Sequence, residues 1–72
     1  MTKLGLTPKQ AHMKNLIKVF IDENGYSPTI REMQEISNLS SPSAVHRLVQ
    51  CLTERGHASF LPGQTRSIVV ID

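Results

Sequence analysis

Side chains that could contact nucleic acid gather in one stretch of the sequence, between Ser41 and Gln50. If this stretch is an α-helix with about 100° per residue, one arc roughly 100° wide carries Ser43, His46, Arg47 and Gln50. Arginine can bind guanine or phosphate, and serine and histidine can donate or accept at base edges. The pattern is typical of a helix that reads the DNA major groove, and also of a surface helix whose polar face meets only water.

The flanks of this arc add to the same interpretation. Ala44 can meet a thymine methyl group, and Ser41 with the free amides at the helix start can hold a phosphate through the helix dipole. Glu54 shares the polar arc but lies about 16 Å along the axis from Ser43, at 1.5 Å per residue. We therefore expect this carboxylate to lie outside the groove, where it would not repel phosphate.

Catalytic and metal-binding chemistry finds little support. Cys51 is the single cysteine, and His46, five positions earlier, is turned from it by about 140° on a helix. We expect Cys51 to be a small buried hydrophobic residue and His12 to be a surface histidine. The sequence contains no glycine-rich phosphate loop, and no carboxylate pair has room for a pocket. We expect no enzyme activity, metal, cofactor or small-molecule ligand.

The composition is that of one small folded domain. A chain of 72 residues buries about 60% of its unfolded surface, and 39% hydrophobic with 19% charged residues is an ordinary globular balance. The lone cysteine excludes a disulfide framework, and no apolar run resembles a signal peptide or a membrane span. We expect a single cytoplasmic domain over residues 1–72, with residues 1–5 as a flexible N-terminus.

The net charge of +2 permits nucleic-acid binding without demonstrating it. Residues 1–20 carry +4, residues 21–40 carry −3 and residues 41–72 carry +1. We expect Lys14 and Lys18 to lie on a solvated face, and the acidic patch from Asp22 to Glu35 to be solvated as well. Arg66 either reaches a phosphate or keeps its turn soluble.

Two helices are predicted before this stretch. The first begins with a capping box at Thr7-Pro8-Lys9-Gln10 and ends at Asn24-Gly25. The second begins with a capping box at 29–32 and ends near Asn38. Their apolar stripes, spaced for one helix face, are Met13, Leu16, Ile17 and Phe20 in the first and Ile30, Met33 and Ile36 in the second.

A third helix and a hairpin complete the order. The helix begins at Ser41-Pro42 and is closed by Gly56, and its apolar arc holds Ala44, Val45, Leu48, Val49 and Leu52. The hairpin has strands over 57–61 and 67–71 around the turn 62–66. This order predicts a mostly α fold with a small β-hairpin, a winged helix-turn-helix of three helices and a two-stranded wing.

Several segments together resemble the N-terminal DNA-binding domain of LexA repressors. They extend over about residues 6–70 and are Leu6-Thr7-Pro8-Lys9-Gln10, Gly25-Tyr26-Ser27-Pro28-Thr29, Glu32-Met33, Ser41-Pro42-Ser43-Ala44-Val45-His46-Arg47-Leu48, Leu52-Thr53-Glu54-Arg55-Gly56, Leu61-Pro62 and Arg66-Ser67-Ile68. The His46-Arg47 form of the third helix and the Leu61-Pro62 wing are most similar to the alphaproteobacterial type.

The resemblance implies a cytoplasmic transcriptional repressor of the SOS-response type. Its helix 41–55 would dock in the major groove of palindromic double-stranded operators, with a homodimer on the DNA. With Gln50 from the polar arc, the DNA-binding residues are then Ser41, Ser43, Ala44, His46, Arg47, Gln50, Gln64, Thr65 and Arg66.

Two departures from LexA proteins qualify the resemblance. The sequence stops at Asp72 without the self-cleaving C-terminal domain, so we expect either an excised fragment or a stand-alone regulator, such as a phage or mobile element encodes. The wing has Gly63-Gln64-Thr65 where the similar type is more basic, which implies a weaker grip on the DNA backbone. The alternative is a protein-binding winged helix that captures a larger repressor or enzyme through the acidic face 22–35 or the hairpin edge from Ile68.

Overall fold

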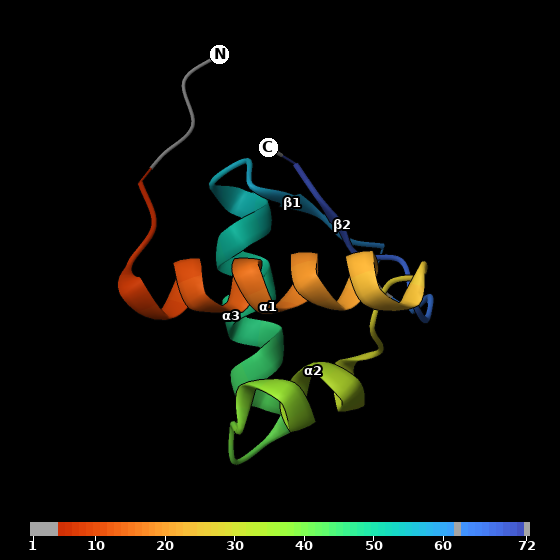
Figure 1. The fold of residues 1–72 in the computed structure, drawn as a ribbon. Helices are drawn as coiled ribbons and strands as arrows, with labels where there is room; N and C mark the ends of the chain where they lie inside the picture. Colours follow the sequence, from red (N-terminus) through yellow and green to blue (C-terminus); the bar gives the residue numbers. More distant parts are fainter. Residues whose placement is uncertain (1–4, 62, 72) are drawn as a thin grey trace.

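The computed structural model describes residues 5–61 and 63–71. Residues 1–4, most of the N-terminus that was expected to be flexible, lie outside the described residues. Three helices are followed by two short strands, in the order α1 (Pro8–Asn24), α2 (Ile30–Ser37), α3 (Pro42–Glu54), β1 (Ala58–Ser59) and β2 (Val69–Val70) (Figure 1). None of the helices in this described part is long and apolar enough to cross a membrane.

Both predicted capping boxes are present. At the start of α1 the Gln10 amide donates to Thr7 Oγ1 at 3.3 Å, and the Thr7 amide donates to Gln10 Oε1 at 3.0 Å. The start of α2 repeats the arrangement with Thr29 and Glu32, at 3.1 and 2.9 Å. Each box satisfies two amides that the helix itself leaves without partners, which fixes where the helix begins.

Left-handed residues end the first two helices at the predicted places. Gly25 has φ 78° after α1, and its amide donates to the Ile21 carbonyl; Asn38 has φ 59° after α2. Glycine and asparagine tolerate this conformation better than other residues do, so these positions reverse the chain at low cost. The turn from Asn38 to Ser41 then brings α3 against α2.

The core is made of aliphatic residues from all three helices and the hairpin. α3 packs against both other helices, with α1 crossing it (Figure 1). The buried hydrophobic residues are Met13, Ile17, Met33, Val45, Val49, Leu52, Ala58 and Ile68. Ile36 was expected on the buried face of α2 but is 38% exposed, one residue before the end of the helix. Cys51 is half-buried rather than buried.

The hairpin is shorter than predicted. Among the described residues of the hairpin, Ala58 with Val70 and Ser59 with Val69 pair as antiparallel strands, and the Ile71 amide donates to the His57 carbonyl at 2.8 Å. Beyond Ser59 the ladder is replaced, because Ser67 Oγ accepts from the Leu61 amide and lies 3.1 Å from the Leu61 carbonyl oxygen. The three helices and antiparallel hairpin confirm the mostly α winged helix-turn-helix fold.

Candidate nucleic-acid interface

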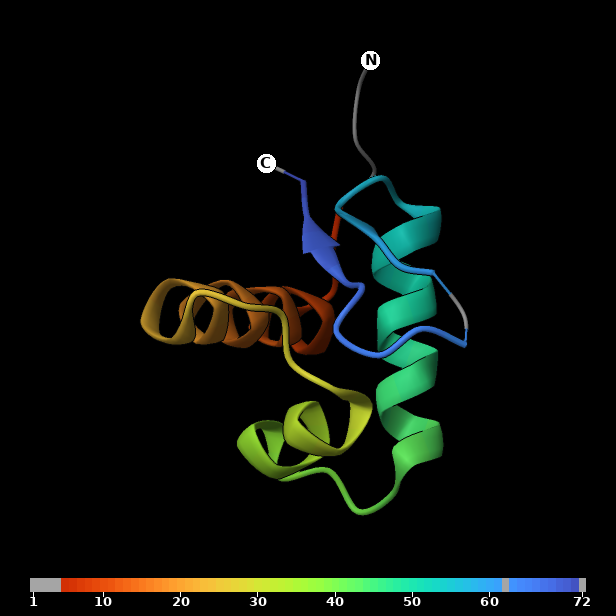
Figure 2. The same cartoon turned by 90° about the vertical axis from the view of Figure 1, so that its right-hand side faces the viewer.

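α3 lies at one edge of the molecule, with α1 and α2 on the same side of it (Figure 2). Val45, Val49 and Leu52 face the core and are buried. The opposite side is polar, and its residues Ser43, His46, Arg47 and Gln50 are all exposed. The predicted arc is therefore one continuous outer surface, because the core holds the helix by its other side.

The first turn of α3 places a hydroxyl and backbone amides at one end of this surface. Ser41 is extended, and its Oγ accepts from the Ala44 amide at 3.4 Å. The hydroxyl proton of Ser41 is not used by this cap and can be donated to another acceptor. Ala44 is half-buried, so only part of its methyl group faces outward. This end of the helix has the partial positive charge that favours an anion.

Gln50 and Glu54 interact one turn apart on the outer side. Gln50 Nε2 donates to Glu54 Oε1 at 3.2 Å. The carboxylate is thus drawn toward the middle of α3, although its backbone lies in the last turn. Gln50 keeps a second amide proton and its carbonyl oxygen for other partners.

The hairpin contacts the polar side of α3 through an aromatic residue that the sequence did not single out. The rings of His46 and Phe60 meet edge-to-face, with centroids 6.5 Å apart and planes at 70°. A groove of about 340 Å³ runs between α3 and the hairpin, lined by His46, Val49, Gln50, Thr53, Phe60 and Gly63. Gln64 and Thr65 are exposed beyond it, where they flank a second hollow with His46. The hairpin and α3 therefore form one surface.

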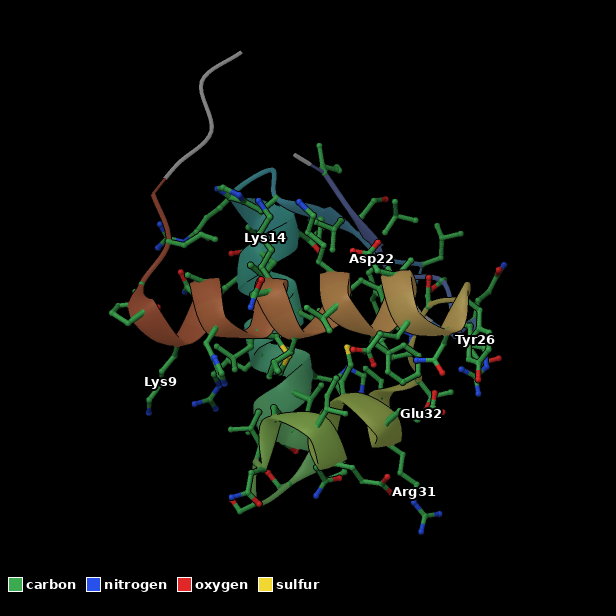
Figure 3. The ribbon with its side chains drawn as sticks, viewed as in Figure 1. Lys9, Lys14, Asp22, Tyr26, Arg31 and Glu32 are labelled. Carbon is green, nitrogen blue, oxygen red and sulfur yellow. The ribbon has the colours of Figure 1, made fainter. Side chains whose placement is uncertain are left out.

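Arg66 is exposed but lies against the segment that begins α2, and its expected contact with phosphate stays a prediction. Its Nη1 donates to Glu32 Oε1 at 2.7 Å and to the Ser27 carbonyl at 3.0 Å, and Nη2 lies 3.4 Å from Glu32 Oε2. The guanidinium carbon lies 4.5 Å from the centroid of the Tyr26 ring. Figure 3 shows Tyr26 and Glu32 at the same flank of the molecule. We call Arg66, Glu32, Ser27 and Tyr26 the clasp.

Glu32 is consequently not part of a freely solvated acidic patch. Its carboxylate accepts from the Thr29 amide and from Arg66. These hydrogen bonds lower the pKa of Glu32 below its usual value of 4.5, with the Thr29 amide contributing most. Arg31 and Glu35, by contrast, form an open surface pair at 3.7 Å.

The two lysines of α1 differ from each other. Lys18 is exposed, as predicted, whereas Lys14 is half-buried, with its Nζ 3.0 Å from His57 Nδ1. The prediction of a solvated face is therefore wrong for Lys14, because the turn after α3 covers it. Among the residues 5–61 and 63–71, no cluster of three His, Cys, Asp or Glu side chains could hold a metal ion.

Comparison with known proteins decides the family. Over residues 2–67 the chain matches the family described as the LexA DNA binding domain. The chain belongs to this family. Its membership confirms the resemblance drawn from the sequence segments and makes this a DNA-binding domain.

Members of the LexA family from several bacteria are similar to nearly the whole chain. It is 39% identical over 66 residues to the LexA repressor of Novosphingobium aromaticivorans, covering 92% of this chain and 28% of the relative. It is 40% identical over 67 residues to the LexA repressor of Pelotomaculum thermopropionicum, covering 93% and 33%. The LexA repressor of Frankia casuarinae is 33% identical over 70 residues, covering 97% and 27%. The chain thus spans about a third or less of the length of these relatives.

Within this LexA-type domain, sequence reasoning missed the residues that join the elements of the surface. Phe60 carried a signal, since it is one of only three aromatic residues and stands in a predicted strand. Glu32 was identified as a helix cap within the acidic patch, and Arg66 as a turn residue and DNA-binding candidate, but no contact between the two was predicted. No local pattern links two residues 34 positions apart, so the clasp could be found only in the folded chain.

Proposed function

We propose that the chain reads a specific sequence of double-stranded DNA by inserting the outer side of α3 into the major groove. The observation that carries this proposal is the exposure of Ser43, His46 and Arg47 on a helix whose other side is fixed in the core. A polar side held this firmly can present hydrogen-bonding groups in a fixed pattern. Recognition of a base sequence requires such a fixed pattern of donors and acceptors opposite the base edges.

The size of α3 fits this role. A helix with its side chains is about 10–12 Å across, and the major groove is about 12 Å wide. With 13 residues, α3 is about 20 Å long at 1.5 Å per residue. The first half would lie in the groove, and the half that carries Glu54 would leave it.

Each exposed residue then has a chemical role. Arg47 is proposed to bind guanine through its paired donors, while Ser43 and His46 contact base edges and Ala44 meets a thymine methyl group. Ser41 and the first amides of α3 are proposed to hold a phosphate. Gln50 is proposed to contact the far end of the site with the groups that Glu54 leaves available.

The hairpin is proposed to contact the DNA backbone beside the groove. Gln64 and Thr65 can donate to phosphate through their side chains without adding charge. Since these residues are neutral, the hairpin should contribute little to the salt dependence of binding. Arg66 is considered separately below.

The similar full-length proteins are named repressors, and we propose that this domain is the DNA-reading part of such a repressor. One small module buries only about 600–1,000 Å² on DNA. Tight binding therefore calls for two copies on the half-sites of a palindromic operator, as a homodimer on the DNA.

The protein-binding alternative keeps part of each feature that suggested it. At the hairpin edge Ile68 is fully buried, whereas Val69 and Ile71 are exposed. In the acidic face Glu32 pairs with Arg66, whereas Asp22, Glu23 and Glu35 are exposed. We propose DNA reading ahead of it, because the exposed polar side of α3 and the family of the chain both favour nucleic acid.

The test is selection of bound sites from a random duplex pool, followed by titration of the selected duplex at two salt concentrations. DNA reading predicts a recurring half-site and an affinity that falls steeply with salt as counterions are released. A pool that yields no recurring sequence would overturn the proposal.

A further inference from the structure

The second arm of the hairpin is tied to the segment that begins α2. Ser27 Oγ donates to the Ile68 carbonyl at 2.6 Å, and the Ser27 carbonyl accepts from Arg66. Ile68 and Pro28 are both fully buried at this junction. The second arm is therefore fixed in the core at Ile68 and joined to the clasp at Arg66, two residues earlier in the sequence.

Glu32 is held in place before Arg66 reaches it. Its side chain accepts from the Thr29 amide as part of the capping box, so the carboxylate has little freedom to turn away. The two terminal nitrogens of Arg66, Nη1 and Nη2, face the two oxygens of the Glu32 carboxylate. The Tyr26 ring lies against the guanidinium. Paired contacts of this kind fix direction as well as distance.

Residues 63–65, which lie between the two anchors, are called the tip of the hairpin. The first arm is anchored on α3 through Phe60 and His46, and the second on α2 through Arg66 and Glu32. Between them, the Gln64 amide donates to the Leu61 carbonyl at 3.2 Å, and Ser67 Oγ lies 3.1 Å from the Gln64 carbonyl oxygen. The tip is thus held by its two anchored ends and by these turn hydrogen bonds, rather than by a strand ladder.

We propose that Arg66 is a positioning residue, which through Glu32 holds the hairpin tip beside α3 and does not itself bind phosphate. The inference rests on the proposed function, because it assigns the tip to the DNA backbone. A tip that is already ordered loses little conformational entropy when it binds DNA. Its affinity is therefore higher without any new contact.

Removal of the Glu32 charge should change the affinity for DNA in the direction opposite to that expected from charge alone. A DNA-binding protein that loses a carboxylate is attracted more strongly to phosphate. Glu32→Gln should nevertheless bind the selected duplex more weakly, by about two- to tenfold, as expected for one or two lost or weakened hydrogen bonds. Gln10 serves the same capping role in α1, so glutamine at position 32 can keep the cap while it loses the charge that pairs with Arg66.

Glu35→Gln is the matched control. It removes the same charge from the same helix, but Glu35 is paired only loosely with Arg31 on the surface. This variant should bind the duplex as tightly as the unchanged chain, or slightly more tightly. If Glu32→Gln binds as tightly as Glu35→Gln, the positioning role is wrong.

Arg66→Met distinguishes positioning from phosphate contact. Affinity falls as salt rises, and removing a phosphate-binding residue makes the fall of log affinity with log salt less steep by about 1. Positioning predicts weaker binding with an unchanged slope. It also predicts that Glu32→Gln combined with Arg66→Met binds no more weakly than Arg66→Met alone, because both changes open the same clasp. A less steep salt dependence in Arg66→Met, or a double variant whose loss of affinity equals the sum of the two single losses, would overturn the proposal.

A measurement without DNA separates this inference from the proposed function. Backbone amide relaxation by NMR should show that Gln64 and Thr65 become more mobile in Glu32→Gln and remain as ordered in Glu35→Gln. If those amides do not change, the clasp does not hold the tip, whatever DNA the chain binds. If they change but the unchanged chain selects no duplex, the proposed function fails while the clasp stands.

Discussion

The rings of His46 in α3 and Phe60 in the hairpin form a T-shaped pair, so that a proposed base-contacting residue is in contact with the wing. The positive edge of one ring meets the negative face of the other, which favours a single ring orientation. The outer side of α3 is therefore shaped by two elements, and the hairpin contributes to it before any DNA arrives.

Replacing Phe60 should affect DNA binding more than folding. Phe60→Leu keeps an apolar side chain against the core and should cost less than about 1.5 kcal/mol of stability, while it removes the ring that orients His46. We expect weaker discrimination at one base position, measured by competition between the selected duplex and its single-base variants. Leu61→Ala, at an exposed neighbour in the same arm, is the control and should discriminate normally. Equal discrimination by both variants would contradict a role for Phe60.

Arg47 should be the strongest single contact of the site. Arg47→Ala is expected to lose about 1–3 kcal/mol of binding free energy and to relax the choice of base at one position. Lys18→Ala removes the same charge from α1, which packs on the other side of α3, and should change the affinity for all sequences alike. Titration of each variant against matched and single-base-changed duplexes checks this. A uniform loss in Arg47→Ala would make Arg47 a phosphate contact instead.

The cap of α2 should matter to stability. Thr29→Ala removes the hydroxyl that accepts from the Glu32 amide and should lower the free energy of unfolding by about 1 kcal/mol. Thr29→Ser retains a capping hydroxyl and should lose much less. Urea unfolding followed by circular dichroism measures both. If the alanine and serine variants unfold at the same urea concentration, the cap does not contribute as described.

The clasp should open in acid. Because the folded chain lowers the pKa of Glu32 below 4.5, the ionised carboxylate stabilises the fold above the unfolded pKa, and this contribution is lost as the pH falls through the lower folded value. The stability difference between the unchanged chain and Glu32→Gln should be constant from about pH 7 to pH 6 and shrink toward pH 3. Urea midpoints of the two chains across this range measure it. A difference that grows in acid would contradict the assigned shift.

The sequence predicted the helices well because each boundary has a local chemical cause. Thr7 with Gln10 and Thr29 with Glu32 form their caps within one turn, and Gly25 and Asn38 end helices through their own backbone freedom. The polar arc of α3 also follows from spacing alone. These features depend on neighbours three or four residues apart.

The parts that were not predicted depend on distant partners. Arg66 pairs with Glu32, and Lys14 Nζ lies beside the His57 ring. The Ser67 hydroxyl takes the place of a strand ladder at Leu61. A side chain with three or more donors, such as arginine or lysine, can be satisfied by water or by many partners. Only the folded arrangement decides which partner it meets.

The most direct test of groove insertion is chemical protection of guanine N7, an atom exposed in the major groove. Dimethyl sulfate should methylate the free selected duplex evenly, and the bound chain should protect guanines within each half-site. With Arg47→Ala, at a concentration that saturates the duplex, one guanine per half-site should become reactive again. A bound duplex whose guanine N7 atoms all stay reactive would contradict the account, because α3 would then lie outside the major groove.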